Sequence, residues 1–253
     1  MVSPGYSVCD VGCDHAFTPI CLVKDKKSPR ALALDVNEGP ILRAREHIAA
    51  EAVDGLVEER LSDGLEAYIP GEADALIISG MGGRLMIRIL SDYPQKTSSF
   101  KELILSPQSD IPAVRIFLYN AGFRIADEDM VKEDGKFYFI IKVVPGDEGA
   151  LPGSMCSRGV GEDNESCAAY REISPDESEC FADYGEALIR KRSPVFKEYL
   201  EHMRGKFESA LKEITDGKNK PGTAYGERLE KREREIVKEL QKIAYLLDYY
   251  TQI

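Results

Sequence analysis

The chain has 253 residues, of which 43% are apolar and 30% are charged. This is enough for one globular core, or one core with an appended piece, and it excludes a chain that is disordered throughout. No apolar run reaches the roughly 18 residues of a membrane-spanning helix, and the first six residues lack the regions of a signal peptide. The six cysteines form no CxxC pair, which argues against a disulfide framework and a zinc site. We expect a cytoplasmic protein that binds neither a membrane nor a metal.

The net charge of −11 is unevenly distributed. Residues 1–146 carry 16 Lys and Arg against 22 Asp and Glu, a net charge of −6. Residues 147–185 carry 2 against 10, a net charge of −8, whereas residues 186–253 carry 15 against 12, a net charge of +3. The chain divides into a mildly acidic body, a strongly acidic connector and a slightly basic tail, so the total does not exclude a nucleic-acid partner.

The body alternates short apolar runs with helical patterns. Asn37 is a candidate N-cap for one helix, with Pro40 in its first turn, and residues 111–120 form another that Gly122 ends. Five runs bounded by Gly, Pro or Asp have the pattern of buried parallel strands: residues 7–12, 30–35, 57–63, 73–80 and 102–107. This alternation predicts a parallel sheet with right-handed crossovers.

The body ends differently, with a predicted hairpin. Residues 123–133 and 136–144 have strand patterns, and Asp134-Gly135 between them is a strong signal for a tight turn. Five parallel strands followed by an antiparallel edge hairpin suit an α/β, Rossmann-like sheet of the class I methyltransferase kind better than a dehydrogenase sheet. We therefore assign residues 1–146 to one such domain.

The remainder of the chain comprises an acidic segment and a helical tail. Residues 147–185 are rich in Gly, Ser, Asp and Glu with little periodicity, which predicts a flexible acidic insertion. Two helices follow in residues 186–253, with apolar positions at helical and heptad-like spacing: Phe196, Leu200, Met203, Phe207, Leu211 and Ile214, then Leu229, Ile236, Leu240, Ile243, Leu247 and Tyr250. We expect an antiparallel helical hairpin of the coiled-coil type.

The loop after the first strand contains Asp10, Gly12 and Asp14. Ligands of open parallel sheets bind at the carboxyl ends of strands. A dinucleotide site would have a glycine at the position of Asp14, because a carboxylate there repels a pyrophosphate. S-adenosylmethionine instead has an ammonium and a sulfonium, so this pattern favours that cofactor over NAD. An ordinary structural turn is the alternative.

Two acids at later strand ends support the same cofactor. Asp35 ends the second strand, where an acid can accept hydrogen bonds from both ribose hydroxyls. Asp63 ends the third strand, where an Asp can bind the adenine amino group. Each has an alternative role as a helix cap or turn residue.

The fourth strand ends in the glycine-rich run Ser79-Gly80-Met81-Gly82-Gly83-Arg84. Glycines there give a flat substrate close access to the backbone and its N–H groups. A phosphate-binding loop at a helix N-terminus is the competing interpretation.

Several of these segments together resemble the bacterial tRNA (adenine-22-N1)-methyltransferase family. They are D-V-G-C-D-H-A-F-T-P-I from Asp10, residues 35–40, S-D-G-L-E at 62–66, S-G-M-G-G at 79–83 and E-D-G-K-F-Y at 133–138. The resemblance covers most of residues 7–146 and resumes near Tyr184. Only six residues precede the first predicted strand, where family members have a helical segment, and Asp35 stands where the family more often has Glu.

The resemblance implies methyl transfer from S-adenosylmethionine to N1 of an adenine in tRNA. Cofactor contacts are expected from Asp10, Gly12, Asp14, His15, Asp35, Val36, Asp63, Gly64, Gly80 and Met81. Substrate contacts are expected from His15, Gly82, Gly83, Arg84, Arg190, Lys191 and Arg192. Asp14 is the candidate catalytic residue, because a carboxylate can stabilise the positive charge of the methylated ring; building the loop is its alternative role.

Two further functions remain open from the sequence. One is methyl transfer to another nucleotide or a small molecule. The other is a non-catalytic nucleotide-binding module whose helical hairpin recruits a partner. The oligomeric state is not fixed by the sequence, and a monomer is compatible with it.

Overall fold

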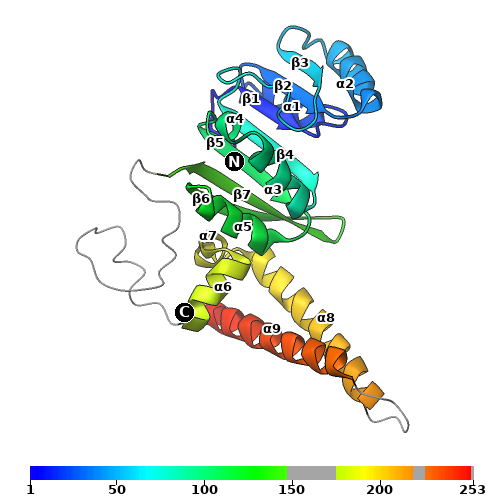
Figure 1. Cartoon of the computed structure of the whole chain (residues 1–253), viewed down its shortest axis with the longest axis vertical. Coiled ribbons are helices and arrows are strands. Elements are labelled where there is room, and N and C mark those ends of the chain that lie inside the picture. Colours follow the sequence, from blue (N-terminus) through cyan, green and yellow to red (C-terminus); the bar gives the residue numbers. More distant parts are fainter. Residues whose placement is uncertain (147–174, 219–225, 252–253) are drawn as a thin grey trace, which may run out of the picture. The chain divides into compact units, whose positions relative to one another are not determined.

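The computed structural model describes residues 1–146, 175–218 and 226–251 (Figure 1). These residues divide into two compact units. The first unit takes residues 1–129 and 138–146, and the second takes residues 130–137 together with the described residues from 175 onward. Each unit is described by itself below.

The first unit is built on a seven-stranded sheet of order β3-β2-β1-β4-β5-β7-β6. The first five strands are parallel, and β7 pairs with β5 in the antiparallel sense. The strands are β1 (Val8–Val11), β2 (Ala31–Asp35), β3 (Val57–Leu61), β4 (Ala75–Met81), β5 (Glu102–Pro107), β6 (Phe123–Glu133) and β7 (Lys136–Pro145). The Rossmann-like sheet with an antiparallel edge hairpin is therefore confirmed, and the strand bounds lie within two residues of the predicted ones.

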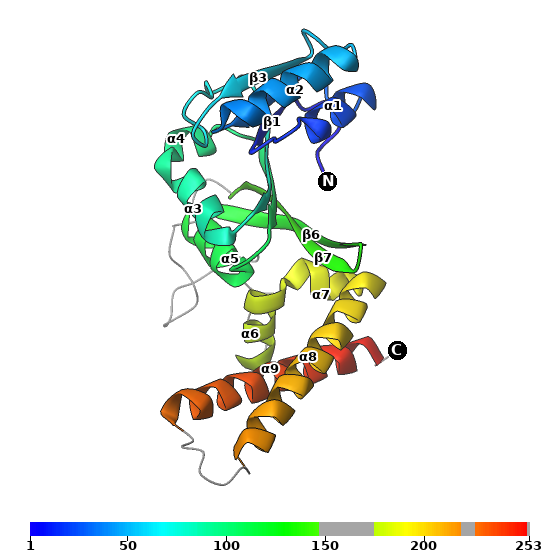
Figure 2. The same cartoon turned by 90° about the vertical axis from the view of Figure 1, so that its right-hand side faces the viewer.

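Helices cover both faces of this sheet (Figure 2). They are α1 (Phe17–Lys24), α2 (Glu38–Ala50), α3 (Gly83–Asp92), α4 (Pro94–Thr97) and α5 (Ile111–Asn120). One apolar core joins the sheet to α3 and α5 through Met86, Leu90 and Leu118, and the other joins it to α1 and α2 through Ile20 and Ile48. Successive side chains of a strand point to opposite faces, so each central strand contributes to both cores.

This alternation decides where two site acids point. Val8 and Ala33 belong to the core under α1 and α2, whereas Cys9 and Leu34 belong to the opposite core. Asp10 and Asp35 share the parity of Val8 and Ala33 respectively, so both carboxylates point to the α1/α2 side at the ends of neighbouring strands.

The second unit contains four helices within its described residues. They are α6 (Pro175–Tyr184), α7 (Glu186–Lys191), α8 (Pro194–Lys218) and α9 (Glu227–Thr251). α8 and α9 pack against each other and run in opposite directions (Figure 1), as the apolar spacing predicted. Phe196, Leu200, Ile236 and Ile243 are buried, but Leu229 is 40% exposed near the start of α9. None of the helices in the described ranges is long and apolar enough to cross a membrane.

The prediction of a flexible insertion over residues 147–185 is wrong at its end. Residues 147–174 lie outside the described residues, but 175–184 form helix α6. Cys180 and Tyr184 on this helix are buried, and the Tyr184 hydroxyl donates a hydrogen bond of 3.0 Å to Glu239 on α9. The acidic composition of this segment gave no indication of a helix, although its buried side chains pack within the helical unit.

The boundary predicted after residue 146 also differs from the compact units, because the hairpin tip groups with the helices. Phe137 contacts the rings of Tyr199 and His202 on α8, with centroids 5.4 and 5.6 Å apart. Lys132 forms an ion pair with Glu198 on the same helix. The periodicity of β6 and β7 gave no sign of these partners, because they lie about 65 residues further along the chain.

Candidate active site

The predicted cofactor residues meet at the carboxyl ends of β1, β2 and β4. The strand order reverses between β1 and β4, since β2 and β3 lie on one side and β5 on the other. Such a switch point opens a crevice at the strand ends and is where open α/β sheets bind ligands. The sheet topology therefore places the loop from Gly12 to Ala16 in the position of a ligand-binding loop.

This loop has a tightly constrained backbone. The N–H groups of Gly12 and Cys13 both donate to the carbonyl of Leu34, at 2.8 and 3.0 Å. Gly12 has a φ of +77°, and Asp14 and Ala16 are also left-handed, with φ of 48° and 58°. Left-handed residues other than glycine cost conformational energy and persist only where surrounding contacts hold them.

The carboxylate of Asp35 supplies one of those contacts. Asp35 Oδ2 accepts a hydrogen bond from the backbone N–H of Asp14 at 3.3 Å, and Oδ1 accepts one from the N–H of Asn37 at 3.0 Å. Only 8% of Asp35 is exposed. Each oxygen of a carboxylate can accept a further hydrogen bond, so the side chain is still able to receive two hydroxyl donors.

Asp10 is the most strongly perturbed acid of the site. It is 4% exposed, and none of the described residues donates a hydrogen bond to its carboxylate. Burial raises its pKa from 3.8 to about 7, and the nearby negative charge of Asp35 adds to the rise. Burial and the same two acids raise the pKa of Cys13 to about 12, so this thiol is not a nucleophile at neutral pH. Two acids crowded into a low dielectric favour a cationic ligand.

Gly12 and Met81 bring the ends of β1 and β4 into contact. A Cβ atom added at Gly12 would lie 2.1 Å from the Met81 methyl carbon. Gly80 is left-handed, with a φ of +74°. The left-handed backbone at Gly12 and Gly80 favours glycine at both positions, and at Gly12 a side chain would also displace the end of the half-buried Met81 side chain.

The other glycines of the fourth loop serve the packing of α3. The N–H of Gly83 donates to the carbonyl of Ser109 at 3.1 Å, and a Cβ there would lie 2.4 Å from that oxygen. The Arg84 side chain is 88% exposed and lies 3.4 Å from Asp110. The Gly83 N–H is therefore not available to a phosphate, and the close packing requires a glycine at this position. The expected substrate contacts of Gly82, Gly83 and Arg84 stay predictions.

Val36 after β2 and Asp63 after β3 lie at the same edge but on the surface, whereas Gly64 is buried. The Asp63 side chain is 65% exposed, 3.6 Å from Arg88, and Val36 is 58% exposed. Ser62, which the sequence did not single out, fixes this turn: its N–H donates to the Asp35 carbonyl and its hydroxyl donates to the carbonyl of Gly64, at 2.8 and 2.9 Å. The ends of β2 and β3 are thereby held together.

Asp14 lies on the surface with two partners. Its side chain is 64% exposed; Oδ1 lies 3.3 Å from the guanidinium of Arg43, and Oδ2 lies 3.4 Å from His15 Nε2. His47 Nδ1 lies 3.0 Å from the backbone carbonyl of His15. Arg43 and His47 are one turn apart on α2, so one face of this helix clamps the loop. The sequence offers no signal that could have identified them, because a four-residue spacing is common to surface residues of any helix.

The basic cluster of the tail is largely engaged within the second unit. Arg190 pairs with Glu186 at 2.8 Å and lies over the Phe181 ring, whereas Arg192 lies 4.3 Å from the centroid of the Tyr249 ring. These contacts are ones that a solvated helix face would also make. The expected contact of Arg190, Lys191 and Arg192 with a substrate stays a prediction.

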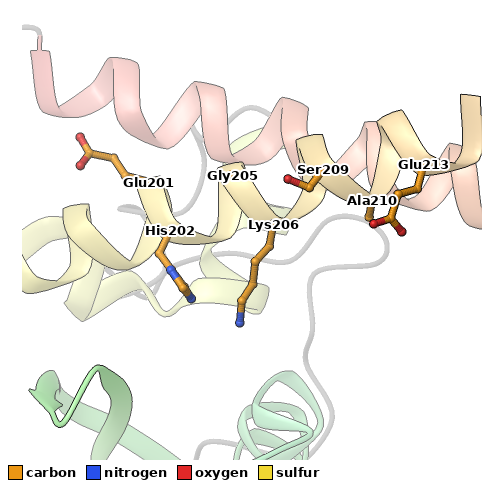
Figure 3. A pocket seen from close by; sticks show the side chains of 7 residues that line it. All are labelled: Glu201, His202, Gly205, Lys206, Ser209, Ala210 and Glu213. Atoms are coloured by element: carbon orange, nitrogen blue, oxygen red, sulfur yellow. The ribbon is translucent and has the colours of Figure 1, made fainter. Parts of the chain in front are cut away.

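A shallow groove lies along α8 (Figure 3), where His202 and Lys206 point to the same side. Its lining residues are Glu201, His202, Gly205, Lys206, Ser209, Ala210 and Glu213. Its lining does not include the strand-end acids Asp10, Asp35 and Asp63, so this groove is not the cofactor site that the sequence predicts. Within the described ranges, no three His, Cys, Asp or Glu side chains are placed to hold a metal ion.

The chain is similar to known methyltransferases. A family profile described as a methyltransferase domain matches residues 1–141. The tRNA (adenine(22)-N(1))-methyltransferase of Bacillus subtilis is 34% identical over 157 residues, which are 62% of this chain and 66% of that protein. The aligned region thus spans slightly less than two thirds of this relative.

Solved structures match nearly the whole chain. Sp1610 of Streptococcus pneumoniae, described as a candidate tRNA (m1A22) methyltransferase, is 30% identical with a TM-score of 0.75, covering 98% of this chain and 95% of that one. The same protein was also solved in complex with S-adenosyl-L-methionine. The B. subtilis M1A22 tRNA methyltransferase TrmK is 26% identical with a TM-score of 0.75, covering 97% and 94% of the two chains. The methyltransferase sheet, the acids at its switch point and these matches identify the chain as a member of the bacterial tRNA (adenine-22-N1)-methyltransferase family.

Proposed function

We propose that this chain transfers the methyl group of S-adenosylmethionine to N1 of an adenine in tRNA, at the position 22 that the relatives' names give. The observation that carries the proposal is the pair of buried acids, Asp10 and Asp35, at the switch point of a methyltransferase sheet. Family membership supplies the substrate class. The proposal places the protein in the cytoplasm, where tRNA is modified.

The residues at the strand ends fit this cofactor. Asp35 accepts the ribose hydroxyls while its backbone contacts hold it in place, and the ionised Asp10 faces the cationic end of the ligand. Val36 offers an exposed apolar surface to the adenine ring, and Asp63 with Gly64 lies at the strand end beside it. Gly12, Gly80, Met81, Asp14 and His15 complete the set of expected cofactor neighbours. No cluster of basic side chains stands among these residues, which argues for a cationic ligand over a pyrophosphate.

The protein does not need to remove a proton from adenine before the methyl group is transferred. Bound S-adenosylmethionine supplies an electrophilic methyl group on a sulfonium. Adenine N1 has a free lone pair at neutral pH, so no base is needed to activate it, whereas the methylated ring gains a positive charge. The protein's task is therefore to orient the base and to tolerate that charge.

Asp14 serves this task by positioning rather than by direct charge stabilisation. Its carboxylate is solvent-exposed and already paired with Arg43 and His15, and a charge in high dielectric stabilises its neighbours weakly. Its backbone N–H, in contrast, anchors Asp35. The contacts support the loop-building alternative for Asp14 over the catalytic role expected from the sequence.

The tRNA is recognised in part by the basic tail. Residues 186–253 carry a net charge of +3, whereas residues 1–146 carry −6, so phosphate contacts are concentrated in the helical unit. We expect binding of moderate affinity that weakens with added salt.

The decisive experiment combines calorimetry with a methylation assay. The purified chain is titrated with S-adenosylmethionine, then incubated with unmodified tRNA and the cofactor, and the modified nucleotide is mapped. We expect binding of the cofactor and N1-methyladenosine at position 22, and no product with a tRNA that carries guanine there. Cofactor binding with methylation of another nucleotide or of a small molecule would favour the second enzymatic function, and absence of cofactor binding would leave the nucleotide-binding module.

A further inference from the structure

We propose that the ring cluster of His15, Phe17 and His47 is the platform on which the target adenine stacks during methyl transfer. The three rings lie in nearly parallel planes, with interplanar angles of 12°, 25° and 21°. Their centroids are 5.3, 5.3 and 4.8 Å apart, within the range of favourable aromatic contacts. The inference rests on the proposed function and names the residues that would hold its substrate base.

Phe17 is the part of this cluster that a ligand can reach. It is 63% exposed, whereas α1 is anchored in the core by other residues, Ile20 and Val23. A large aromatic ring so exposed gains little from folding, and its removal does not open the core. A structural role would instead bury the ring.

Contacts with α1 and α2 hold the ring cluster in place, although Phe17 is exposed on the surface. Phe17 is the first residue of α1, directly after the left-handed Ala16. His47 contacts the backbone of His15, and Arg43 pairs with Asp14 one turn earlier on α2. Two elements thus fix the planes of the rings before any base arrives, which lowers the entropic cost of binding.

The location is suited to the reacting base. His15 lies in the loop whose backbone is tied to Asp35, and Phe17 directly follows that loop, so the rings border the expected cofactor site. An enzyme that modifies a base must take it out of its stack, and an aromatic platform replaces the lost stacking. The face of an aromatic ring also attracts the positive charge that the adenine ring gains on methylation.

The test removes the ring while keeping an apolar side chain. In Phe17→Leu we expect kcat/KM for tRNA to fall by about 10-fold to 100-fold, the range of one base-stacking contact. The affinity for S-adenosylmethionine and the melting temperature should match the parent, and Phe17→Tyr should restore most of the loss. Leu56→Ala is the control: this residue is 47% exposed and precedes β3, at the opposite end of the strands.

Two outcomes of this test overturn the platform. The first is a Phe17→Leu protein with the kcat/KM of the parent. The second is a Phe17→Leu protein that loses cofactor affinity or melting temperature along with activity, which would mean that the ring builds the loop.

A second measurement tests base stacking on the rings independently of the proposed methylation. Adenosine is titrated into the protein saturated with S-adenosylhomocysteine, and the H2 and H8 proton resonances of adenosine are followed by NMR. Stacking on the rings moves these resonances upfield in the parent and not in Phe17→Leu. If the parent methylates no tRNA, the proposed function fails, and this shift alone decides the platform: its presence in the parent and loss in the variant supports it, and its absence in the parent refutes it.

Discussion

The carboxylate of Asp35 accepts a hydrogen bond from the backbone N–H of Asp14, 3.3 Å away across two neighbouring strand ends. Its other oxygen accepts one from Asn37 at the start of α2. A single buried side chain therefore joins the loop after β1 to the loop after β2. The residue expected to bind the cofactor ribose is also a support of the loop that surrounds the cofactor.

Replacing Asp35 tests its binding role together with its structural one, because both of its oxygens accept backbone hydrogen bonds. Asn in its place keeps the shape and one acceptor oxygen but loses the charge and the second acceptor. We expect Asp35→Asn to weaken S-adenosylmethionine binding by about 10-fold to 100-fold, which corresponds to roughly 1 to 3 kcal/mol, as measured by calorimetry. Asp25→Asn, on the surface beside Lys27, is the matched control and should bind as the parent does. Unchanged affinity in Asp35→Asn would show that another residue holds the ribose.

Asp10 should make both stability and cofactor binding depend on pH. Its pKa is about 7 in the folded chain and near 3.8 when unfolded, so between these values the folded state binds more protons. The free energy of unfolding therefore falls as the pH rises from about 4 to about 7, and levels off above pH 8. At pH 8, Asp10→Asn should be more stable than the parent by roughly 4 kcal/mol, measured by urea denaturation.

Ionisation of Asp10 lowers the stability of the fold but should raise the affinity for the cofactor. A cationic ligand prefers the ionised carboxylate, so affinity for S-adenosylmethionine should rise between pH 5.5 and pH 7.5, by up to about tenfold per pH unit below the pKa. Asp10→Asn should bind more weakly and lose this dependence. A parent protein whose affinity is flat over this range would show that Asp10 does not face the cationic end of the cofactor.

Asp14→Asn tests positioning against catalysis. The exposed contacts of this carboxylate with Arg43 and His15 are worth at most about 1 kcal/mol, so we expect turnover to fall by less than about tenfold, with melting temperature and cofactor affinity unchanged. Single-turnover rates with saturating tRNA provide the measurement. A fall of 100-fold or more with intact cofactor binding would instead establish the carboxylate as the group that stabilises the charged product.

Two residues of the basic cluster, Lys191 and Arg192, should respond differently to replacement by Ala. Lys191→Ala should weaken tRNA binding and reduce the slope of log K against log salt by about 0.7 to 0.9, because one phosphate contact is lost. Arg192→Ala should also lower the free energy of unfolding by about 0.5 to 1 kcal/mol, since its guanidinium lies over the Tyr249 ring. Identical salt slopes in the parent and in Lys191→Ala would remove this residue from the tRNA-binding surface.

The sheet and the acids at its strand ends were predictable from local pattern. Apolar runs bounded by Gly, Pro and Asp marked each of the five parallel strands, and Asp134-Gly135 marked the hairpin, because these signals lie within a few residues. Asp10 and Asp35 could be identified for the same reason, since each stands at the end of a strand.

Features that depend on distant partners could not be predicted. Arg43 and His47 act on a loop about 30 residues earlier, and nothing in the helical pattern of α2 distinguishes them from ordinary surface residues. Gly83 has the sequence of a phosphate-loop residue, but its N–H is used by Ser109, which only the fold brings near. The sequence did not predict helix α6, because the segment is acidic overall and only a few of its residues are apolar and buried.

The contacts of the hairpin tip restrict where this chain can be joined to that of a relative to make a chimaeric protein. Residues 130–137 belong to strands that begin and end in the first unit, yet Phe137 and Lys132 find their partners on α8. A chimaera joined near residue 146 would place the tip of one parent against the helices of the other, leaving an aromatic ring and a charge without matched neighbours. The inherited module is therefore discontinuous in sequence: the helices and the tip of the hairpin must be exchanged together.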